Sequence, residues 1–261
     1  MFICYSGMDD ILFVIFGISF IFLMTSAGAA TVFMRKRKVS GRSKNLFLGF
    51  AGGVMLAASF FSLLIPSFTY SEMINIAHVL PAAGGIVVGS LFILFFDILI
   101  SKKTAYGTAD YRDKKLFMAM TLHNIPEGLS VGLTFGLALS HYEDVSILSG
   151  IIFALGIGIQ NFPEGAALAL PLMESTGSKK KAFFLSVLSG VVEPVFAVAG
   201  VFLATEVVYL MPWALCFGAG AMIYVIIDEL IVYTSESKEK RLINLAFIVG
   251  FLIMMSLDLC F

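Results

Sequence analysis

The chain has 261 residues, of which 59% are apolar and 13% charged, and its mean hydropathy is +0.97. Soluble domains typically have about 25% charged and about 45–50% apolar residues. The composition therefore excludes a soluble globular protein and leaves no basic surface for nucleic acid. It predicts an all-α integral membrane protein, with lipid as its surroundings and one transmembrane domain over residues 1–261.

Eight apolar segments are each long enough to cross a bilayer as a helix, which takes about 20 residues. The connections between them are short, so little chain is left for a soluble domain. The expected spans are residues 11–34, 46–69, 79–101, 116–139, 147–172, 181–204, 212–234 and 243–261.

The basic residues all lie in alternate connections. All 17 Lys and Arg residues follow the first, third, fifth or seventh span, whereas the other connections carry acidic residues only. Because basic loops stay in the cytoplasm, we expect a multi-pass protein of the cell membrane with both termini extracytoplasmic.

The second span has a polar face. Met55, Ser59, Ser62 and Pro66 recur at spacings of four, three and four residues, which places them on one side of a helix. Pro66 also leaves the backbone carbonyl of Ser62 without its helical donor. This face either lines a pathway or is a packing seam with a gap-filling methionine.

Further carboxylates lie in the third, sixth, seventh and eighth spans. Asp97 stands near Lys102 and Lys103, and we interpret it as a charge at the membrane interface. The connection after it, 101–115, is polar, and we predict that it is the longest loop and mobile. The later carboxylates are Glu193, beside Pro194, then Asp228, Glu229 and Asp258.

The fourth and fifth spans share the pattern Asn-x-Pro-Glu-Gly, at 124–128 and 161–165. His123 and Glu127 are four residues apart and therefore share a helix face, as do Gln160 and Glu164. The connection between these two spans is short, so the two helices are antiparallel neighbours. The two polar faces then meet at one point inside the membrane.

The glutamates at this point require a partner. An ionised group at the centre of a spanning helix costs about 2.5–3.5 kcal/mol, so Glu127, Glu164 and Glu193 must be protonated, hydrated or bound to a cation. We expect no Lys or Arg inside the spans, so the cation has to come from outside. Imidazole with carboxylate suits zinc and its first-row neighbours. A single buried histidine or glutamate has simpler explanations, but the duplicated motif favours a cation site.

These motifs resemble those of the ZIP (Zrt-, Irt-like protein) family of divalent metal transporters, and most closely its bacterial GufA-like branch. The segments at 123–128 and 160–165 are similar to the family's signatures in its fourth and fifth helices. Further similarity lies at 53–57, 192–194 and 228–230.

The resemblance implies a 3+2+3 arrangement, with helices 1–3 and 6–8 as inverted repeats around helices 4 and 5, and association into homodimers. It also implies two metal positions that share Glu127 and Glu164. Many relatives have histidine at the position of Gln160 and some have aspartate at that of Asn161. The first position would add Met55, His123 and Gln160, and the second Asn124, Asn161 and Glu193.

We therefore expect a transporter that moves Zn²⁺, or Cd²⁺, Fe²⁺ or Mn²⁺, into the cytoplasm, that is not an enzyme and that needs no cofactor. Two alternatives stay open. An intramembrane metalloenzyme would need more than one buried histidine, and a proton or sodium carrier would use the same glutamates. Candidate pathway residues are Ser62, Asp228 and Glu229, of which the last two suit an interfacial ion pair equally well. At the outer entrance we expect Glu143, Asp144 and His141, although a solvated loop position is the favoured interpretation of His141.

Overall fold

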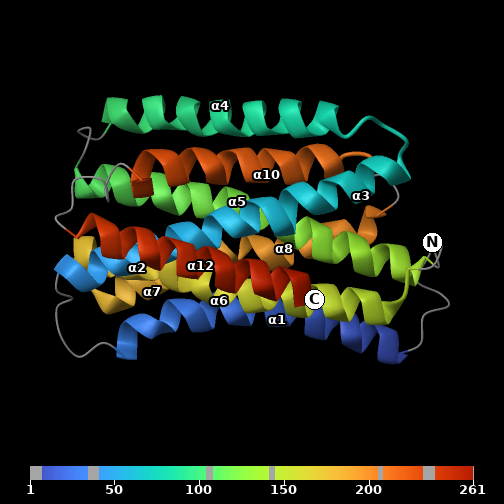
Figure 1. The fold of residues 1–261 in the computed structure, drawn as a ribbon. Coiled ribbons are helices and arrows are strands. Elements are labelled where there is room, and N and C mark those ends of the chain that lie inside the picture. The colour runs from blue at the N-terminus through green and yellow to red at the C-terminus, as the bar shows by residue number, and fades with distance from the viewer. Residues whose placement is uncertain are drawn as a thin grey trace.

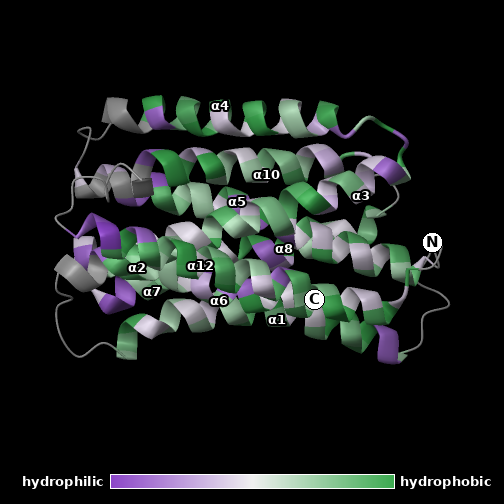
Figure 2. Ribbon diagram, in the orientation of Figure 1, coloured by the Kyte–Doolittle hydropathy of each residue, from purple (hydrophilic) through white to green (hydrophobic). Residues whose placement is uncertain are grey.

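The computed structural model describes residues 8–34, 41–103, 108–140, 145–204, 208–231 and 239–260. Within these ranges all regular elements are helices, and the long ones lie side by side in an elongated bundle (Figure 1). The residues of these helices are mostly hydrophobic, with hydrophilic residues near the ends and in the middle of the bundle (Figure 2). Seven helices in the described chain are long and apolar enough to span a membrane, which confirms an all-α, multi-pass membrane protein.

Most expected spans are found with small changes in their ends, and three of them are interrupted. The start of α1 and the end of α12 lie at the same end of the bundle (Figure 1). The elements are α1 (Met8–Met34), α2 (Gly41–Ala58), η1 (Ser59–Leu64), α3 (Ile65–Met73), α4 (Val79–Lys103), α5 (Ala109–Leu139), α6 (Ile147–Thr176), α7 (Lys179–Gly190), α8 (Val192–Phe202), α10 (Met211–Val225), η2 (Ile226–Ile231) and α12 (Lys240–Cys260).

The predicted long loop at 101–115 is wrong. Helix α4 continues to Lys103 and α5 begins at Ala109, so most of the segment is helical. The Thr108 hydroxyl accepts a hydrogen bond from the backbone N–H of Tyr111 at 3.3 Å and caps α5, as threonine commonly does. The polar composition of the segment thus reflects a capped, charged helix end rather than a loop.

Two prolines coincide with the interruptions in the second and sixth spans. Pro66 lacks an N–H, and the turn before it widens into the π-helix η1, as expected where the regular hydrogen bond is lost. Similarly, α7 ends at Gly190, the residue four positions before Pro194. By contrast, Pro126 and Pro163 lie inside continuous helices.

Four helix pairs are joined by close backbone contacts between glycines: α1 with α6, α2 with α12, α4 with α10, and α5 with α8. In the first pair, Gly28 lies against the carbonyl oxygen of Phe162, and Gly165 against that of Thr25. The other pairs repeat this pattern, each glycine facing the oxygen three residues before its partner. A Cβ at any of these glycines would stand 2.6 Å or less from that oxygen, so a larger residue would push the backbones apart. The other glycines are Gly53 and Gly250, Gly89 and Gly220, and Gly132 and Gly200.

The two helices of each pair run parallel. In the first pair, Gly17 lies against Ala154 and Gly28 against Ala166, so the contacts advance in the same direction along both chains. Gly128 and Gly132 of α5 similarly meet Glu193 and then Ala197 of α8. The motif helices α5 and α6 therefore each have a parallel partner from another part of the chain.

Candidate metal centre

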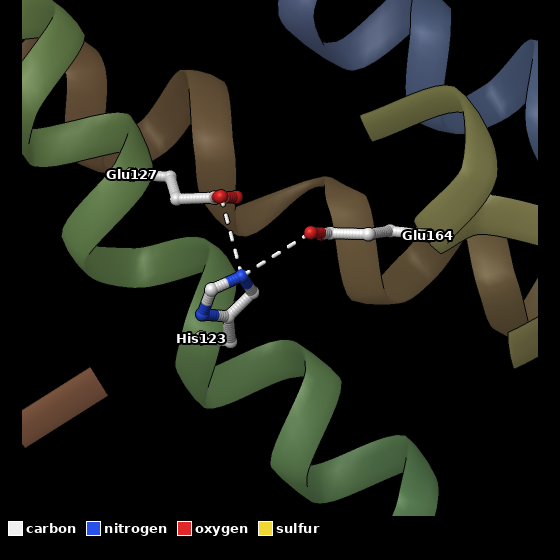
Figure 3. Close-up of side chains that lie close together, drawn as sticks. All are labelled: His123, Glu127 and Glu164. Atoms are coloured by element: carbon white, nitrogen blue, oxygen red, sulfur yellow. Dashed lines mark ion pairs between the residues drawn. The ribbon is translucent and has the colours of Figure 1, made fainter. Parts of the chain in front are cut away.

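Three side chains from the duplicated motif converge between α5 and α6 (Figure 3). His123 Nε2 lies 3.2 Å from Oε1 of Glu127 and 3.5 Å from Oε1 of Glu164. One ligand atom from each residue lies within 4.8 Å of the other two, and all three side chains are buried. This is the only group of three or more such residues within ligand distance in the described part of the chain.

The polar atoms at this point are poorly satisfied. Both imidazole nitrogens, Oε2 of Glu127 and both carboxylate oxygens of Glu164 have no hydrogen-bond partner among the described residues. Buried polar groups are almost always hydrogen-bonded, because an unpaired one costs about 1–3 kcal/mol. Several unpaired acceptors around one point are the arrangement that a bound cation would satisfy.

Gln160 connects the centre to a second polar chain. Its Nε2 donates to Oε1 of Glu127 at 2.8 Å, and its Oε1 accepts from the Ser62 hydroxyl at 2.7 Å. The Ser62 oxygen also lies 2.8 Å from Oδ1 of Asp258 in α12. The polar face of the second span is thus turned toward the site, and Asp258, to which the sequence assigned no role, belongs to the same network.

A second group surrounds Glu193 on α8. Its carboxylate accepts from Nδ2 of Asn161 at 2.9 Å and from the Thr25 hydroxyl at 2.7 Å. Asn124 Nδ2 donates to the backbone oxygen of Ser189 at 3.1 Å. Because Asn124 and Asn161 adjoin His123 and Gln160 in the chain, this group lies beside the first. The sequence gives no signal for Thr25, which stands in a small-residue segment typical of helix packing.

Met55 lies in a buried apolar cluster. The cluster is on the side of the centre that faces the end of the bundle with the Lys- and Arg-containing connections. On α5, Met120 precedes His123, and on α6, Leu168 follows Glu164. We call this cluster the inner apolar layer; its buried members are Leu48, Met55, Met120, Leu168, Leu172, Ala182, Met222 and Ile226.

The expectation that no basic side chain is buried in the bundle is wrong at Lys115. Its side chain is 1% exposed; Nζ lies 3.0 Å from Oδ1 of Asp97 and is hydrogen-bonded to Asp228. Lys115 was assigned to the loop because α5 was expected to begin at residue 116. The sequence left two roles open for Asp228, an ion pair or a place in the pathway, and the structure shows the ion pair. Glu127 and Glu164 form ion pairs only with His123 among the described residues.

Some candidate residues lie beyond what the structure describes. Glu229 belongs to η2, but its side chain is outside the described part. The expected outer entrance residues, His141, Glu143 and Asp144, fall outside the described residues altogether.

The fold and the centre describe a multi-helix membrane protein with a buried cluster of one histidine and two glutamates that could hold a cation. The profile of the ZIP Zinc transporter family matches residues 101–258. The chain is 32% identical to Zinc transporter ZIP11 of Homo sapiens, over 97% of this chain and 98% of that protein. It is 34% identical to Zinc transporter GufA of Myxococcus xanthus, over 90% and 93%, and 31% identical to Zinc transporter ZIPB of Bordetella bronchiseptica, over 91% and 77%.

The chain therefore belongs to the ZIP family of metal transporters. This confirms the resemblance seen in the sequence motifs, including the GufA-like branch, and the expectation that the protein is a transporter and not an enzyme. The metalloenzyme alternative is thereby set aside.

Proposed function

We propose that the protein carries divalent transition-metal ions, with Zn²⁺ as its main substrate, across the cell membrane into the cytoplasm. The observation that carries the proposal is the convergence of His123, Glu127 and Glu164, buried and with unpaired acceptor atoms, inside a bundle of apolar helices. The names of the relatives, all zinc transporters, support the same substrate.

The spacing of the donor atoms fits zinc. Bonds from zinc to imidazole nitrogen and carboxylate oxygen are about 2.0–2.2 Å long, so neighbouring ligands of a tetrahedral site stand roughly 3.3–3.6 Å apart. The separations of His123 Nε2 from the two carboxylates are 3.2 and 3.5 Å. A metal ion held by these three groups therefore requires little movement of the helices.

We propose that Gln160 and Met55 complete this first position when metal binds. The amide of Gln160 already reaches Glu127 through its nitrogen, and a rotation of the amide would offer its oxygen instead. Met55 is buried in the inner apolar layer and would contribute its thioether by a change of side-chain conformation.

A second metal position would lie around Glu193, as the family resemblance implies. Asn161 already bonds to the Glu193 carboxylate, and Asn124 is held on the neighbouring backbone. The second carboxylate oxygens of Glu127 and Glu164 have no hydrogen-bond partner among described residues. These oxygens are suited to bridge two ions.

We also propose that α5 is an eighth span. Helices α1 and α6 are parallel, and the chain crosses between them as α2 to α3 and as α4. An odd number of crossings must separate two parallel spans, so α5 has to supply the third. Its absence from the seven apolar helices reflects the polar residues of the motif.

The glycine pairs support an inverted-repeat arrangement. In such an arrangement the first, second and third spans correspond to the sixth, seventh and eighth, and α5 corresponds to α6. Under this correspondence the pair of α1 and α6 becomes the pair of α8 and α5. The same correspondence converts the pair of α2 and α12 into that of α10 and α4. The π-helices η1 and η2 also correspond. Repeats of this kind in transporters commonly rock about a site near the membrane centre, and the basic connections put the cytoplasm at the α4–α5 end.

Metal flux into proteoliposomes that contain a zinc-responsive dye tests the proposal. Wild-type protein should give flux above that of protein-free vesicles, and Glu127→Gln or Glu164→Gln should reduce it to that level. Glu174→Gln, on α6 but ten residues from the motif glutamate, is the matched control and should retain flux. Undiminished zinc flux in either motif variant would refute the proposed site, whereas ion flux that persists in chelator and ignores zinc would indicate a proton or sodium carrier.

A further inference from the structure

Lys115 stands in a buried cluster that the central site does not use. Its Nζ contacts Asp97 on α4 and Asp228 in η2, and the Tyr111 hydroxyl donates to the same oxygen of Asp97. The ring of Tyr224 on α10 lies 5.5 Å from Nζ. One ammonium thereby ties three separate helices at the end of the bundle where the basic residues gather.

Such a cluster is costly, so packing alone is a weak explanation for it. The Lys115 side chain is 1% exposed and that of Asp97 13%, whereas that of Asp228 is 37% exposed. Removing an ammonium and a carboxylate from water carries a penalty that their attraction often fails to offset, and apolar residues of similar size are frequently as stable. In some proteins, buried ionic groups instead select one conformation over another. The relevant conformations are those in which α5 is joined to, or separated from, α4 and η2.

The cluster adjoins the inner apolar layer. Leu116 follows Lys115 on α5 and packs against this layer, while Ile226, two residues before Asp228, belongs to it. Helices α5 and α10 thus contribute both to the ion cluster and to the layer between the central site and the basic end. A path for metal through the layer between α5 and η2 would need these two elements to separate, and Lys115 and Asp228 are the ion pair that joins them.

We propose that Lys115 is a gating residue: its ammonium acts as a tethered cation that holds the inner apolar layer closed, and a divalent ion leaving the central site displaces it from Asp228 and Asp97. Only the displacement of Lys115 by a divalent ion rests on the proposed transport of metal; the closure of the layer by Lys115 does not. Exchange of one cation for another keeps the two carboxylates paired in both states. The closed layer then opens when cargo arrives and closes again when the cargo has left.

The test measures how often the layer opens, by the reaction of a thiol placed within it. Leu168→Cys, in a background with Ser at positions 4, 216 and 260, is incorporated into nanodiscs and treated with a water-soluble thiol reagent. Lys115→Met should accelerate labelling by roughly 5- to 150-fold, the range of typical conformational couplings. Lys114→Met, which removes the exposed lysine next to it, and Lys115→Arg, which keeps the charge, should label at the parent rate.

A charge exchange separates gating from a general loss of structure. Lys115→Asp combined with Asp228→Lys and Asp97→Asn retains an ion pair between α5 and η2 without setting two carboxylates against each other, and it should restore slow labelling, whereas a destabilised protein would stay reactive. If Lys115→Met fails to fold, Asp97→Asn and Asp228→Asn each remove one contact and should accelerate labelling in the same way. Folded variants that label at the parent rate would overturn the proposal.

Adding zinc tests the second half of the proposal, in which the departing metal ion displaces Lys115 from its two carboxylates. Zinc should accelerate labelling of the Leu168→Cys protein but not of its Lys115→Met form, which already labels fast, nor of its Glu127→Gln form, which lacks the central site. If Lys115→Met accelerates labelling but zinc does not, the proposal that the transported ion displaces Lys115 is overturned. Loss of zinc flux in wild-type vesicles with the labelling differences intact would refute the proposed function and leave the gate standing.

Discussion

Gln160 lies at a position where, as the family resemblance implies, many relatives have histidine. Its amide donates to Glu127 and accepts from Ser62, which in turn contacts Asp258. It therefore holds the Glu127 carboxylate in place and links it to α12 through Ser62 and Asp258. An imidazole at this position would supply a softer donor but would end the contact with Ser62.

Gln160→His should therefore change metal preference more than it changes folding. A second imidazole favours Zn²⁺ and Cd²⁺ over Mn²⁺, and we expect selectivity for zinc over manganese to rise about tenfold, equivalent to about 1.4 kcal/mol. A metal competition panel in reconstituted vesicles measures this ratio. Gln160→Glu, which adds a hard carboxylate instead, is the control and should not raise the ratio; an unchanged ratio in Gln160→His would mean that residue 160 does not contact the metal.

At the scale of residues, the sequence predicts the central site but not its supports. His123 and Glu127 lie on one helix face, and the repeated motif places Glu164 opposite them, so local spacing is sufficient. The bond from Thr25 to Glu193 and the contact between Ser62 and Asp258 join residues more than 160 positions apart. Only the packing of α1 against α8 and of η1 against α12 creates these contacts, and no local pattern reports it.

At the scale of elements, the four glycine pairs determine how closely the motif helices approach their partners. Gly132 on α5 lies against Ala197 of α8, one turn beyond the point where Gly128 meets the Glu193 backbone. Small-residue spacing in the sequence predicts close helix contact, but it does not say which helix is the partner. The partner depends on the whole topology, and the structure supplies it.

Gly132→Val should separate α5 from α8 and disturb both proposed metal positions. A Cβ at residue 132 would stand 1.9 Å from the Ala197 oxygen, and forced overpacking typically costs about 1–3 kcal/mol. We expect a lower thermal midpoint in detergent together with loss of zinc flux. Val198→Leu, which enlarges an exposed side chain of the same partner helix α8, is the control; a Gly132→Val protein with wild-type stability and flux would contradict the close contact.

At the scale of the whole molecule, charge and hydropathy carry different information. The lengths of the apolar segments, together with the basic residues in alternate connections, predict eight crossings, whereas the mean hydropathy of the helices identifies seven and misses α5. The reason is physical: the residues of the proposed cation site, His123, Asn124 and Glu127, are the ones that make α5 less apolar. The same helix was also given a wrong start, because its charged first turns resemble a loop and conceal the buried Lys115.

The crossing of α5 can be measured with two thiols at its ends. Ser140→Cys lies at the end of α5 that faces away from the basic connections, and Lys114→Cys lies near its start on an exposed position. In right-side-out vesicles with the native cysteines replaced, an impermeant thiol reagent should label residue 140 and leave residue 114 unlabelled until the membrane is opened with detergent. Inside-out vesicles should give the reverse pattern. Labelling of both positions from one side would mean that α5 does not cross the membrane. The parallel packing of α1 against α6 would then have no explanation, because α2 to α3 and α4 supply only two crossings between them.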